Sequence, residues 1–389
     1  MESKILPYGR QSISIEDIDA VVDVLRSPFL TQGPVVPAFE QAISTEVGSE
    51  FAVAANSATS ALHIACIALG LGPGDYLWTS PITFVASANC GCYCGAKVDF
   101  VDIDPSTGLM NIQDLELKLQ KAEKLGRLPK VVIPVHLAGA SCDMRAIGQL
   151  ARRYRFAVIE DASHAIGGKY QGRPVGSCVH SDICVFSFHP VKIITSGEGG
   201  LASTNDPKLA QYMYELRSHG ITKDLNRFER IAPGPWSYEQ QHLGFNYRMT
   251  DISAALGLSQ LKRLHEILAE RHRLYQRYLK ILADLPIRLL QISEEVYSSL
   301  HLAIIRLDDP SPKHHRQVFE GLRGCGIGVQ LHYSPVHLHP FYRRLGFQEG
   351  DFPEAEAYAR NALSLPLYPG LQESDLQRVA DSLKLVLQA

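Results

Sequence analysis

Short apolar runs alternate along the first half of the chain with segments in which apolar residues recur every three or four positions. The helical spacing is clear at 59–69, 144–154 and from about 112. The β-prone runs lie at 51–54, 75–80, 98–101, 131–133, 157–159 and 183–186. Such alternation predicts a mostly parallel sheet with helices on both faces. Because most runs are rich in Val, Ile and other apolar residues, we expect the sheet to be buried on both sides.

The pattern changes on either side of this region. Helices are predicted near the start, at 15–25 and 37–46, and a strand and helix follow at 201–204 and 207–216. A loop-like stretch covers 221–244, and helical spacing then runs from 252 to about 282 with a break near Arg263. The C-terminal part predicts a strand at 302–307 and helices at 318–323, 354–363 and 375–387. We therefore expect an N-terminal arm and large domain over 1–262 and a small α+β domain over 263–389.

Composition narrows the class of protein. Hydrophobic residues make up 46% of the 389 residues and charged residues 20%, with a net charge of -3. This balance gives no electrostatic case for nucleic acid or an anionic membrane surface. The first ten residues lack a signal-peptide core and no stretch is apolar enough to span a bilayer, so we expect a cytoplasmic protein. The eight cysteines are expected to be reduced, and Cys90, Cys92 and Cys94 lack the matching downstream pair of a metal site.

One lysine stands between an apolar strand and a glycine-rich turn. The strand at 183–186 is followed by Ser187, His189 and Lys192, and glycines at 197, 199 and 200 permit a sharp turn close to a ligand. Strand ends of this kind hold the ligand sites of α/β proteins. A lysine with an ordinary pKa of about 10.4 becomes a nucleophile for Schiff-base chemistry when burial or nearby charge lowers that pKa. The alternative is an exposed loop lysine beside a turn.

Three further clusters follow predicted strands. Asp161 and His164 come after the strand at 157–159. A buried aspartate at this position requires a cationic ligand atom or an arginine beside it, unless it caps a helix. For His164 the ordinary interpretation is a hydrogen-bonded histidine of the core. The helix start at 56–62 is rich in hydroxyls and offers unpaired N–H groups to a phosphate, or is an ordinary Ser/Thr cap. Phe84 could stack on a planar ligand or pack into the core.

A single ligand explains all four clusters. Pyridoxal phosphate needs a lysine for its Schiff base, an aspartate that keeps its ring nitrogen protonated, a phosphate site at a helix start and an aromatic ring beside its own. The sequence therefore predicts an enzyme that uses this cofactor.

The same stretches resemble the sugar-nucleotide aminotransferases of the DegT/DnrJ/EryC1/StrS family, and the resemblance covers nearly the whole chain. The matching stretches are 30–34, 56–62, 81–84, 160–165, 187–200, 246–249 and 365–369. The resemblance implies fold type I of the pyridoxal-phosphate enzymes, like aspartate aminotransferase, with a large domain built on a mostly parallel sheet and a small C-terminal α+β domain.

The resemblance also implies roles for individual residues. Lys192, Asp161 and His164 would be catalytic, with Lys192 bonded to the cofactor, Asp161 at its ring nitrogen and His164 near its ring hydroxyl. Further cofactor contacts would come from Ala58, Thr59, Ser60, Phe84, Ser187 and Asn246. Asn246 would belong to the neighbouring subunit, which implies a homodimer with shared sites. Substrate contacts would come from Tyr8, Pro28, Phe29, Leu30, Thr31, Gln330, Leu331, His332 and Tyr333.

The implied reaction moves the amino group of L-glutamate to C4 of a UDP-4-keto-6-deoxy-N-acetylhexosamine, as in pseudaminic acid synthesis. A related 4- or 3-aminotransferase acting on another UDP-, dTDP- or GDP-keto sugar is the main alternative, and Ala138, where many relatives carry an aromatic residue, leaves the sugar open. Lys192 argues against the dehydratases of the family, which have histidine there. A regulator built on the same fold is the remaining alternative, and the chain shows no helix-turn-helix extension or basic arm of the kind such regulators carry.

Overall fold

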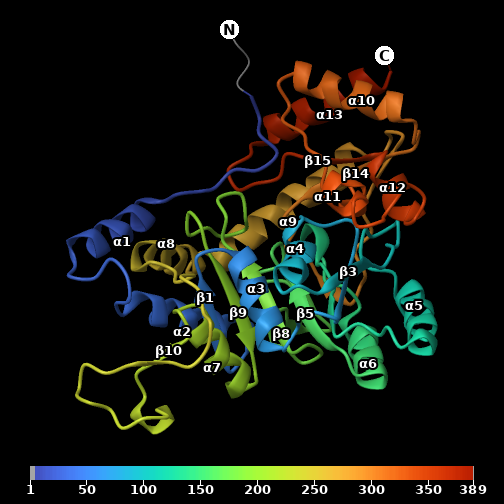
Figure 1. The fold of residues 1–389 in the computed structure, drawn as a ribbon. Coiled ribbons are helices and arrows are strands. Elements are labelled where there is room, and N and C mark those ends of the chain that lie inside the picture. The colour runs from blue at the N-terminus through green and yellow to red at the C-terminus, as the bar shows by residue number, and fades with distance from the viewer. Residues whose placement is uncertain (1–4, 389) are drawn as a thin grey trace.

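A seven-stranded sheet forms the centre of the computed structural model, which describes residues 5–388 (Figure 1). Residues 1–4 and 389, the outer ends of the two predicted domains, lie outside the described residues. The strand order is β1-β9-β8-β5-β4-β2-β3. The strands are β1 Phe51–Ala55, β2 Tyr76–Thr79, β3 Lys97–Phe100, β4 Val131–Ile133, β5 Ala157–Asp161, β8 Ile183–Ser187 and β9 Gly200–Thr204. Only β9 runs antiparallel to its neighbours among these seven strands, so the predicted mostly parallel sheet is confirmed.

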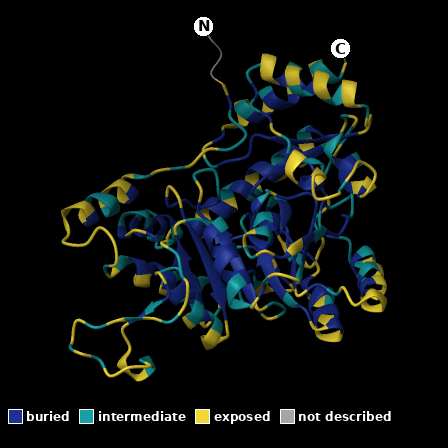
Figure 2. Ribbon diagram, viewed as in Figure 1, coloured by how far each residue is buried: buried dark blue, intermediate teal, exposed yellow. Residues whose placement is uncertain are grey.

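Helices cover both faces of the sheet because consecutive residues of its central strands point to opposite faces and are both apolar. Val185 packs with α3 Ala58–Ala68, α4 Ala86–Tyr93 and α7 Pro207–Leu216. Phe186, next to it in β8, packs on the opposite face with α2 Val35–Val47. Toward the other edge, that second face is covered by α5 Ile112–Leu125 and α6 Met144–Tyr154. The central strands are consequently buried throughout (Figure 2).

The C-terminal part is reached through two consecutive helices, α8 Asp251–Leu261 and α9 Leu264–Ile281, and the predicted break near Arg263 is confirmed. It contains a second sheet with the order β12-β14-β15. Its remaining elements include α10 Pro312–Gly324, α11 Pro340–Arg343, α12 Pro353–Ala359 and α13 Glu373–Leu387, and its strands are β12 Ile287–Leu289, β14 Ala303–Leu307 and β15 Ala362–Leu365. These elements share their own apolar core, to which Leu6 of the N-terminal arm also belongs. A domain boundary at 262–263 stays a prediction.

One predicted element was wrong, and one helix was missed. The helix predicted over 354–363 ends at Ala359, because residues 362–365 form the buried strand β15, whose Ser364 pairs with Gln330. Helix α4 was not predicted, because its sequence ASANCGCY is poor in strong helix formers.

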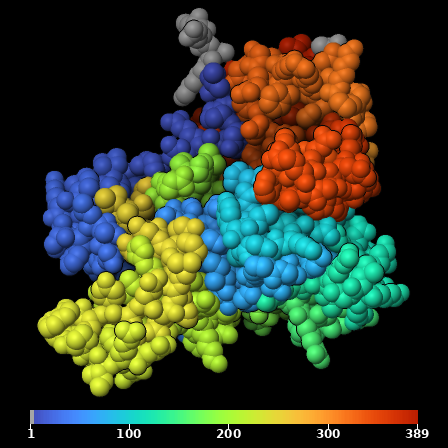
Figure 3. All heavy atoms as spheres, in the orientation of Figure 1, coloured from blue at the N-terminus to red at the C-terminus, as the bar shows by residue number. Residues whose placement is uncertain are grey.

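Several short elements complete the structure. The N-terminal helix α1 Ile15–Arg26 packs on α8, and the segment 221–244 extends from the body of the molecule (Figures 1 and 3). The short strands are β6 Lys169–Tyr170, β7 Arg173–Pro174, β10 Ile221–Thr222, β11 Glu239–Gln240 and β13 Val296–Tyr297, and the 3-10 turns are η1 Leu137–Gly139, η2 Leu225–Arg227 and η3 Val336–Leu338. Among residues 5–388, no helix is both long and apolar enough to cross a membrane.

Candidate active site

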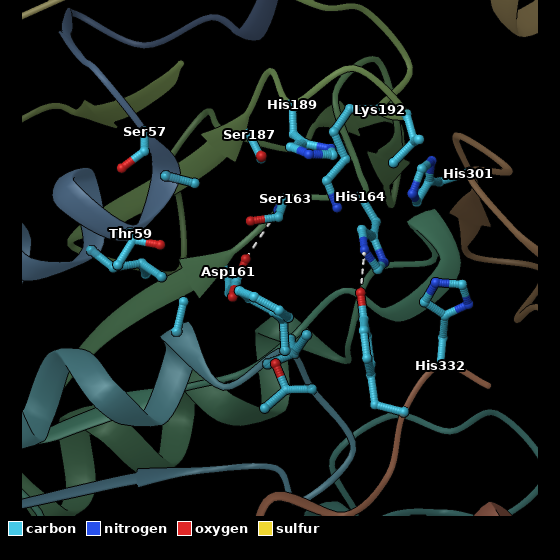
Figure 4. Close-up of a pocket in the computed structure, with 18 of the residues that line it drawn as sticks. Ser57, Thr59, Asp161, Ser163, His164, Ser187, His189, Lys192, His301 and His332 are labelled. Carbon is cyan, nitrogen blue, oxygen red and sulfur yellow. Dashed lines mark hydrogen bonds between the residues drawn. The ribbon is translucent and has the colours of Figure 1, made fainter. Parts of the chain in front are cut away.

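A cavity of about 840 Å³ opens where β5 and β8 end and α3 begins (Figure 4). It gathers most of the residues that the sequence predicts for the site. These are Tyr8, Ala58, Thr59, Ser60, Phe84, Asp161, His164, Ser187, Lys192, Gln330, Leu331, His332 and Tyr333. The cavity is therefore lined by the N-terminal arm, the large sheet and the C-terminal part together.

Lys192 lies in the loop between the antiparallel neighbours β8 and β9. Hydrogen bonds from Phe188 N to Gly199 O (2.9 Å) and from Ser196 N to Phe188 O (3.0 Å) close the loop at its base. The backbone N–H of Lys192 donates to His189 O at 2.9 Å, which turns the chain toward the cavity. Burial lowers the pKa of Lys192 to about 8, while the nearby Asp161 carboxylate acts in the opposite direction. Near neutral pH the neutral, nucleophilic form of Lys192 is therefore far more populated than that of an ordinary lysine.

Asp161 ends β5 and is 5% exposed. Its Oδ2 accepts a hydrogen bond from the Ser87 hydroxyl at 2.6 Å, and its Oδ1 accepts one from the backbone N–H of Ser163 at 3.1 Å. Among the described residues these two polar donors hold the carboxylate, and Lys192 is a cation close enough for the pKa of the lysine to respond to it. The predicted cationic ligand atom at Asp161 stays a prediction. The carboxylate is thus held in one orientation at the wall of the cavity.

His164 is hydrogen-bonded at both ring nitrogens. The backbone N–H of Ala138 points to Nδ1 at 3.3 Å, and Nε2 lies 3.1 Å from the Tyr333 hydroxyl. The His301 ring packs against it with a centroid separation of 4.4 Å. Burial, reinforced by the positive charge of Lys192, holds the pKa of His164 well below its ordinary value, so the ring is neutral. The expectation of a hydrogen-bonded histidine is met, but this one also faces the cavity.

The start of α3 forms a cradle that β9 approaches closely. The Ser57 hydroxyl caps the helix by accepting from Ser60 N at 3.1 Å, and the Ser60 hydroxyl donates to Asn56 Oδ1 at 2.7 Å. A Cβ atom on Gly200 would lie 2.3 Å from Ala58 N, so only glycine fits there. The start of α3 therefore brings serine hydroxyls and the positive end of the helix dipole to the cavity wall. This combination suits the binding of a phosphate group.

Five predicted residues do not line the cavity within residues 5–388 of one chain. Pro28, Phe29, Leu30 and Thr31 are exposed, and Thr31 pairs with Thr250 instead. Asn246 is also exposed and pairs with Ser218. The roles predicted for these five residues therefore stay predictions, and for Asn246 the predicted site is that of a neighbouring subunit.

Other cavity residues were missed from the sequence. His301 is 4% exposed, lines the cavity, and its Nδ1 has no hydrogen-bond partner among the described residues. Ser163 and Glu198 also line the cavity, and Ser87 supports Asp161 from α4. Ser163 and Glu198 lie within the stretches 160–165 and 187–200 that the sequence already marked, whereas His301 and Ser87 are brought to the site by tertiary packing alone.

A lysine on a strand-end loop, a buried aspartate and a helix start facing one cavity of a mostly parallel sheet define a pyridoxal-phosphate-dependent transferase of fold type I. The comparison with protein families agrees, since residues 11–384 match the DegT/DnrJ/EryC1/StrS aminotransferase family. The chain belongs to this family, and it is a sugar aminotransferase that uses pyridoxal phosphate.

Individual relatives match over nearly their whole length. The UDP-4-amino-4-deoxy-L-arabinose–oxoglutarate aminotransferase of Shewanella sediminis is 36% identical and covers 100% of this chain and 99% of its own. The Streptococcus pneumoniae protein Spr1654, described as a sugar aminotransferase and solved in its PMP form, is 32% identical with a TM-score of 0.91, covering 98% and 99% of the two chains. Helicobacter pylori PseC, an aminotransferase of pseudaminic acid biosynthesis, is 31% identical with a TM-score of 0.90, covering 99% and 100%.

Proposed function

We propose that this sugar aminotransferase moves the amino group of L-glutamate to C4 of a UDP-4-keto-6-deoxy-N-acetylhexosamine, in a pathway of the pseudaminic acid type. The observation that carries the proposal is the convergence of Lys192, Asp161 and the start of α3 on one cavity. The similarity to PseC supports the sugar, and the name of the Shewanella relative couples a 4-amino UDP-sugar to oxoglutarate, the product left by glutamate.

The residues present fit the cofactor. Asp161 would hold the ring nitrogen, the amides at the start of α3 and the Ser187 hydroxyl would hold the phosphate, and Phe84 would lie beside the ring. The close approach of Gly200 to Ala58 leaves room for no side chain behind this cradle. When bound at Lys192, pyridoxal phosphate supplies an electron sink for the negative charge that develops on a carbon atom losing its proton.

Lys192 would act as both base and acid. Its Nζ removes the α-proton of L-glutamate in the first half-reaction, and in the second it delivers a proton to C4 of the sugar. Efficient transfer in both directions requires a pKa near the working pH, and the value of about 8 that burial gives Lys192 meets this requirement. The neutral His164 ring, whose pKa lies well below its ordinary value, does not compete for this proton.

A homodimer with shared sites is part of the proposal. Asn246 is exposed and does not line the cavity of its own chain, so a second subunit could present it to the neighbouring site. Co-expression of Lys192→Ala and Asn246→Ala chains tests this sharing. Mixed dimers should regain activity at one of their two sites, because one site then has both residues intact; no recovery in mixed dimers would contradict shared sites.

A second candidate is a related aminotransferase acting on another nucleotide-linked keto sugar. The similarity to the Shewanella relative favours this candidate. Its name specifies a UDP-linked aminoarabinose, and its similarity to this chain is comparable to that of PseC. Ala138, whose backbone N–H donates to the cavity residue His164, lacks an aromatic side chain, which is consistent with a changed sugar pocket. A regulatory protein without activity is not favoured, because Lys192 and Asp161 are both in place.

The test is a substrate panel with the purified, cofactor-loaded protein. L-Glutamate is supplied with UDP-4-keto-6-deoxy-N-acetylhexosamines, UDP-4-keto-arabinose and dTDP-4-keto-6-deoxyglucose, and both 2-oxoglutarate and the amino sugar are measured by mass spectrometry. We expect the highest kcat/KM with a UDP-N-acetylhexosamine and none with Lys192→Ala. Preference for another keto sugar would select the second candidate, and inactivity with all of them would contradict both.

A further inference from the structure

The ring of His332 is held between two tyrosine rings at the wall of the cavity. His332 lines the cavity and is 8% exposed. Its ring centroid lies 5.1 Å from that of Tyr8 and 4.9 Å from that of Tyr333. The Tyr358 hydroxyl donates to the carbonyl oxygen of His332 at 2.9 Å, so the backbone is held as well. Figure 4 shows the His332 ring at the edge of the space that His164 also faces.

Ser364 lies behind this ring, in strand β15. It is completely buried, and its hydroxyl oxygen lies 2.8 Å from Nδ1 of His332. The backbone N–H of Ser364 donates to the carbonyl oxygen of Gln330 at 2.8 Å, and on its other side Ser364 pairs with Ile304 of β14. Pairing on both sides of β15 therefore fixes the backbone from which the hydroxyl reaches the ring.

The direction of the hydrogen bond between Ser364 and His332 follows from the acceptors available. Among residues 5–388, the Ser364 hydroxyl has no partner other than Nδ1 of His332. Leaving the hydrogen of a buried hydroxyl without an acceptor is costly, so the hydroxyl donates to Nδ1. Burial, reinforced by the charge of Lys192, lowers the pKa of His332 to about 3, and the ring is neutral. Its single proton is therefore on Nε2.

The Nε2–H group of His332 is left for a ligand. Nε2 has no hydrogen-bond partner among the described residues, and the ring lines the cavity. An N–H group can only donate, so it selects an oxygen atom that accepts a hydrogen bond. The two proposed substrates carry such oxygen atoms in the carboxylates of L-glutamate and in the carbonyl and phosphate groups of a keto-sugar nucleotide. Without the Ser364 hydroxyl, Nδ1 would have no donor to fix the orientation and the proton of the ring.

We propose that Ser364 is a positioning residue that holds His332 in its Nε2–H form, so that the ring donates a hydrogen bond to an acceptor oxygen of the substrate. Ser364 does not line the cavity among residues 5–388 and acts through His332. The inference rests on the proposed function only for the identity of the two substrates, because the proton position and the orientation of the ring belong to the protein alone.

The first experiment locates the proton of His332 by ¹⁵N NMR of the holoenzyme, labelled at its histidines and free of substrate at neutral pH. The signals of His332 are identified by their absence from the spectrum of His332→Gln. We expect a protonated Nε2 and an unprotonated Nδ1. A proton on Nδ1, or on both nitrogens, would overturn the proposal. Because no turnover is needed, this result stands even if the protein accepts no keto sugar and the proposed function fails.

The second experiment compares Ser364→Ala with Ser364→Thr, which keeps a hydroxyl, and follows the two half-reactions separately by single-turnover absorbance. We expect Ser364→Ala to raise the substrate concentration for half-maximal rate about three- to tenfold, the effect of losing one neutral hydrogen bond, and to change the maximal rate less than about twofold. Ser364→Thr should restore the wild-type value. An effect in the half-reaction with L-glutamate assigns the acceptor oxygen to a carboxylate, and an effect with the keto sugar assigns it to the sugar nucleotide. No effect in either half-reaction, or a loss confined to the maximal rate, would overturn the proposal.

Two variants of His332 repeat the test without changing β15, in case threonine does not fit at position 364. The side-chain amide of His332→Gln reaches the position of Nε2, whereas that of His332→Asn is shorter and lies near Nδ1. We expect His332→Gln to keep more of the affinity for the substrate than His332→Asn. Equal losses in the two variants would overturn the assignment of the donor to Nε2.

Discussion

The hydroxyl of Tyr333 accepts a hydrogen bond from His164. The direction of this hydrogen bond is fixed by the contact that the other ring nitrogen of His164 makes. Because the backbone N–H of Ala138 donates to Nδ1, that nitrogen carries no proton, and the proton of the neutral ring must be on Nε2. Nε2–H then donates to the Tyr333 oxygen at 3.1 Å. The hydrogen of the Tyr333 hydroxyl remains free to donate to an oxygen atom in the cavity. Burial raises the pKa of Tyr333, which keeps that hydrogen in place.

Replacing Tyr333 by phenylalanine should lower kcat/KM for the keto sugar about tenfold, the effect of losing one hydrogen bond of about 1.4 kcal/mol. Tyr342→Phe is the control, because its hydroxyl bonds to Asn89 at 2.7 Å away from the cavity. Steady-state kinetics of the two variants check this expectation. An equal loss in both variants would show that Tyr333 has no specific role in the cavity.

The support that Ser87 gives to Asp161 predicts a graded loss of activity. Asp161→Asn should slow the half-reaction with L-glutamate by about 10²–10⁴-fold, since an amide cannot keep a ring nitrogen protonated. Ser87→Ala should slow it only about tenfold, because the carboxylate loses one hydrogen bond but keeps its charge. Single-turnover absorbance measurements distinguish the two effects. A Ser87→Ala variant as slow as Asp161→Asn would contradict this order.

Lys192 should make the stability of the cofactor-free protein depend on pH. Its folded-state pKa is about 8, and its unfolded value is about 10.4. Between these values the unfolded chain binds more protons, so stability rises with pH across this window, while below pH 8 the full cost of burying the charge is present. Lys192→Met should therefore raise the free energy of unfolding at pH 7 by about 1–3 kcal/mol, allowing for water in the cavity. Urea unfolding at pH 10 should show a smaller gain in the free energy of unfolding for Lys192→Met. An equal gain at both pH values would contradict a lowered pKa of Lys192 in the folded protein.

Arg271 connects α9 to two loops of the C-terminal part. It is 1% exposed, and its Nη1 donates to the carbonyl oxygens of Leu300 (3.1 Å), His301 (3.2 Å) and Leu367 (2.9 Å). Arg271→Met leaves these carbonyls without a donor and should cost about 2–4 kcal/mol of stability. Arg288→Met, which removes an exposed ion pair with Asp308, should cost less than about 1 kcal/mol. Urea denaturation measures both, and similar losses would refute a special role for Arg271.

Local sequence was enough to predict the parts of the site that one strand and its following loop define. Lys192 and Asp161 each come directly after a buried strand, and their position at the same edge of the sheet follows from its parallel order. His301 and Ser87 could not be predicted in this way, because only tertiary packing brings the loop before β14 and helix α4 to the cavity. The incorrect helix over 354–363 has the same origin, since pairing between Gln330 and Ser364 overrides the local helical pattern.

The position of β9 also has a consequence for the order in which the site is completed during synthesis. All seven strands of the large sheet lie between residues 51 and 204, and β9, the last of them, joins the Lys192 loop to the start of α3 through Gly200. A nascent chain that has emerged through α7 therefore carries Lys192, Asp161, Ser187 and the start of α3. Gln330 to Tyr333 emerge more than a hundred residues later, so this wall of the cavity is the last to be translated.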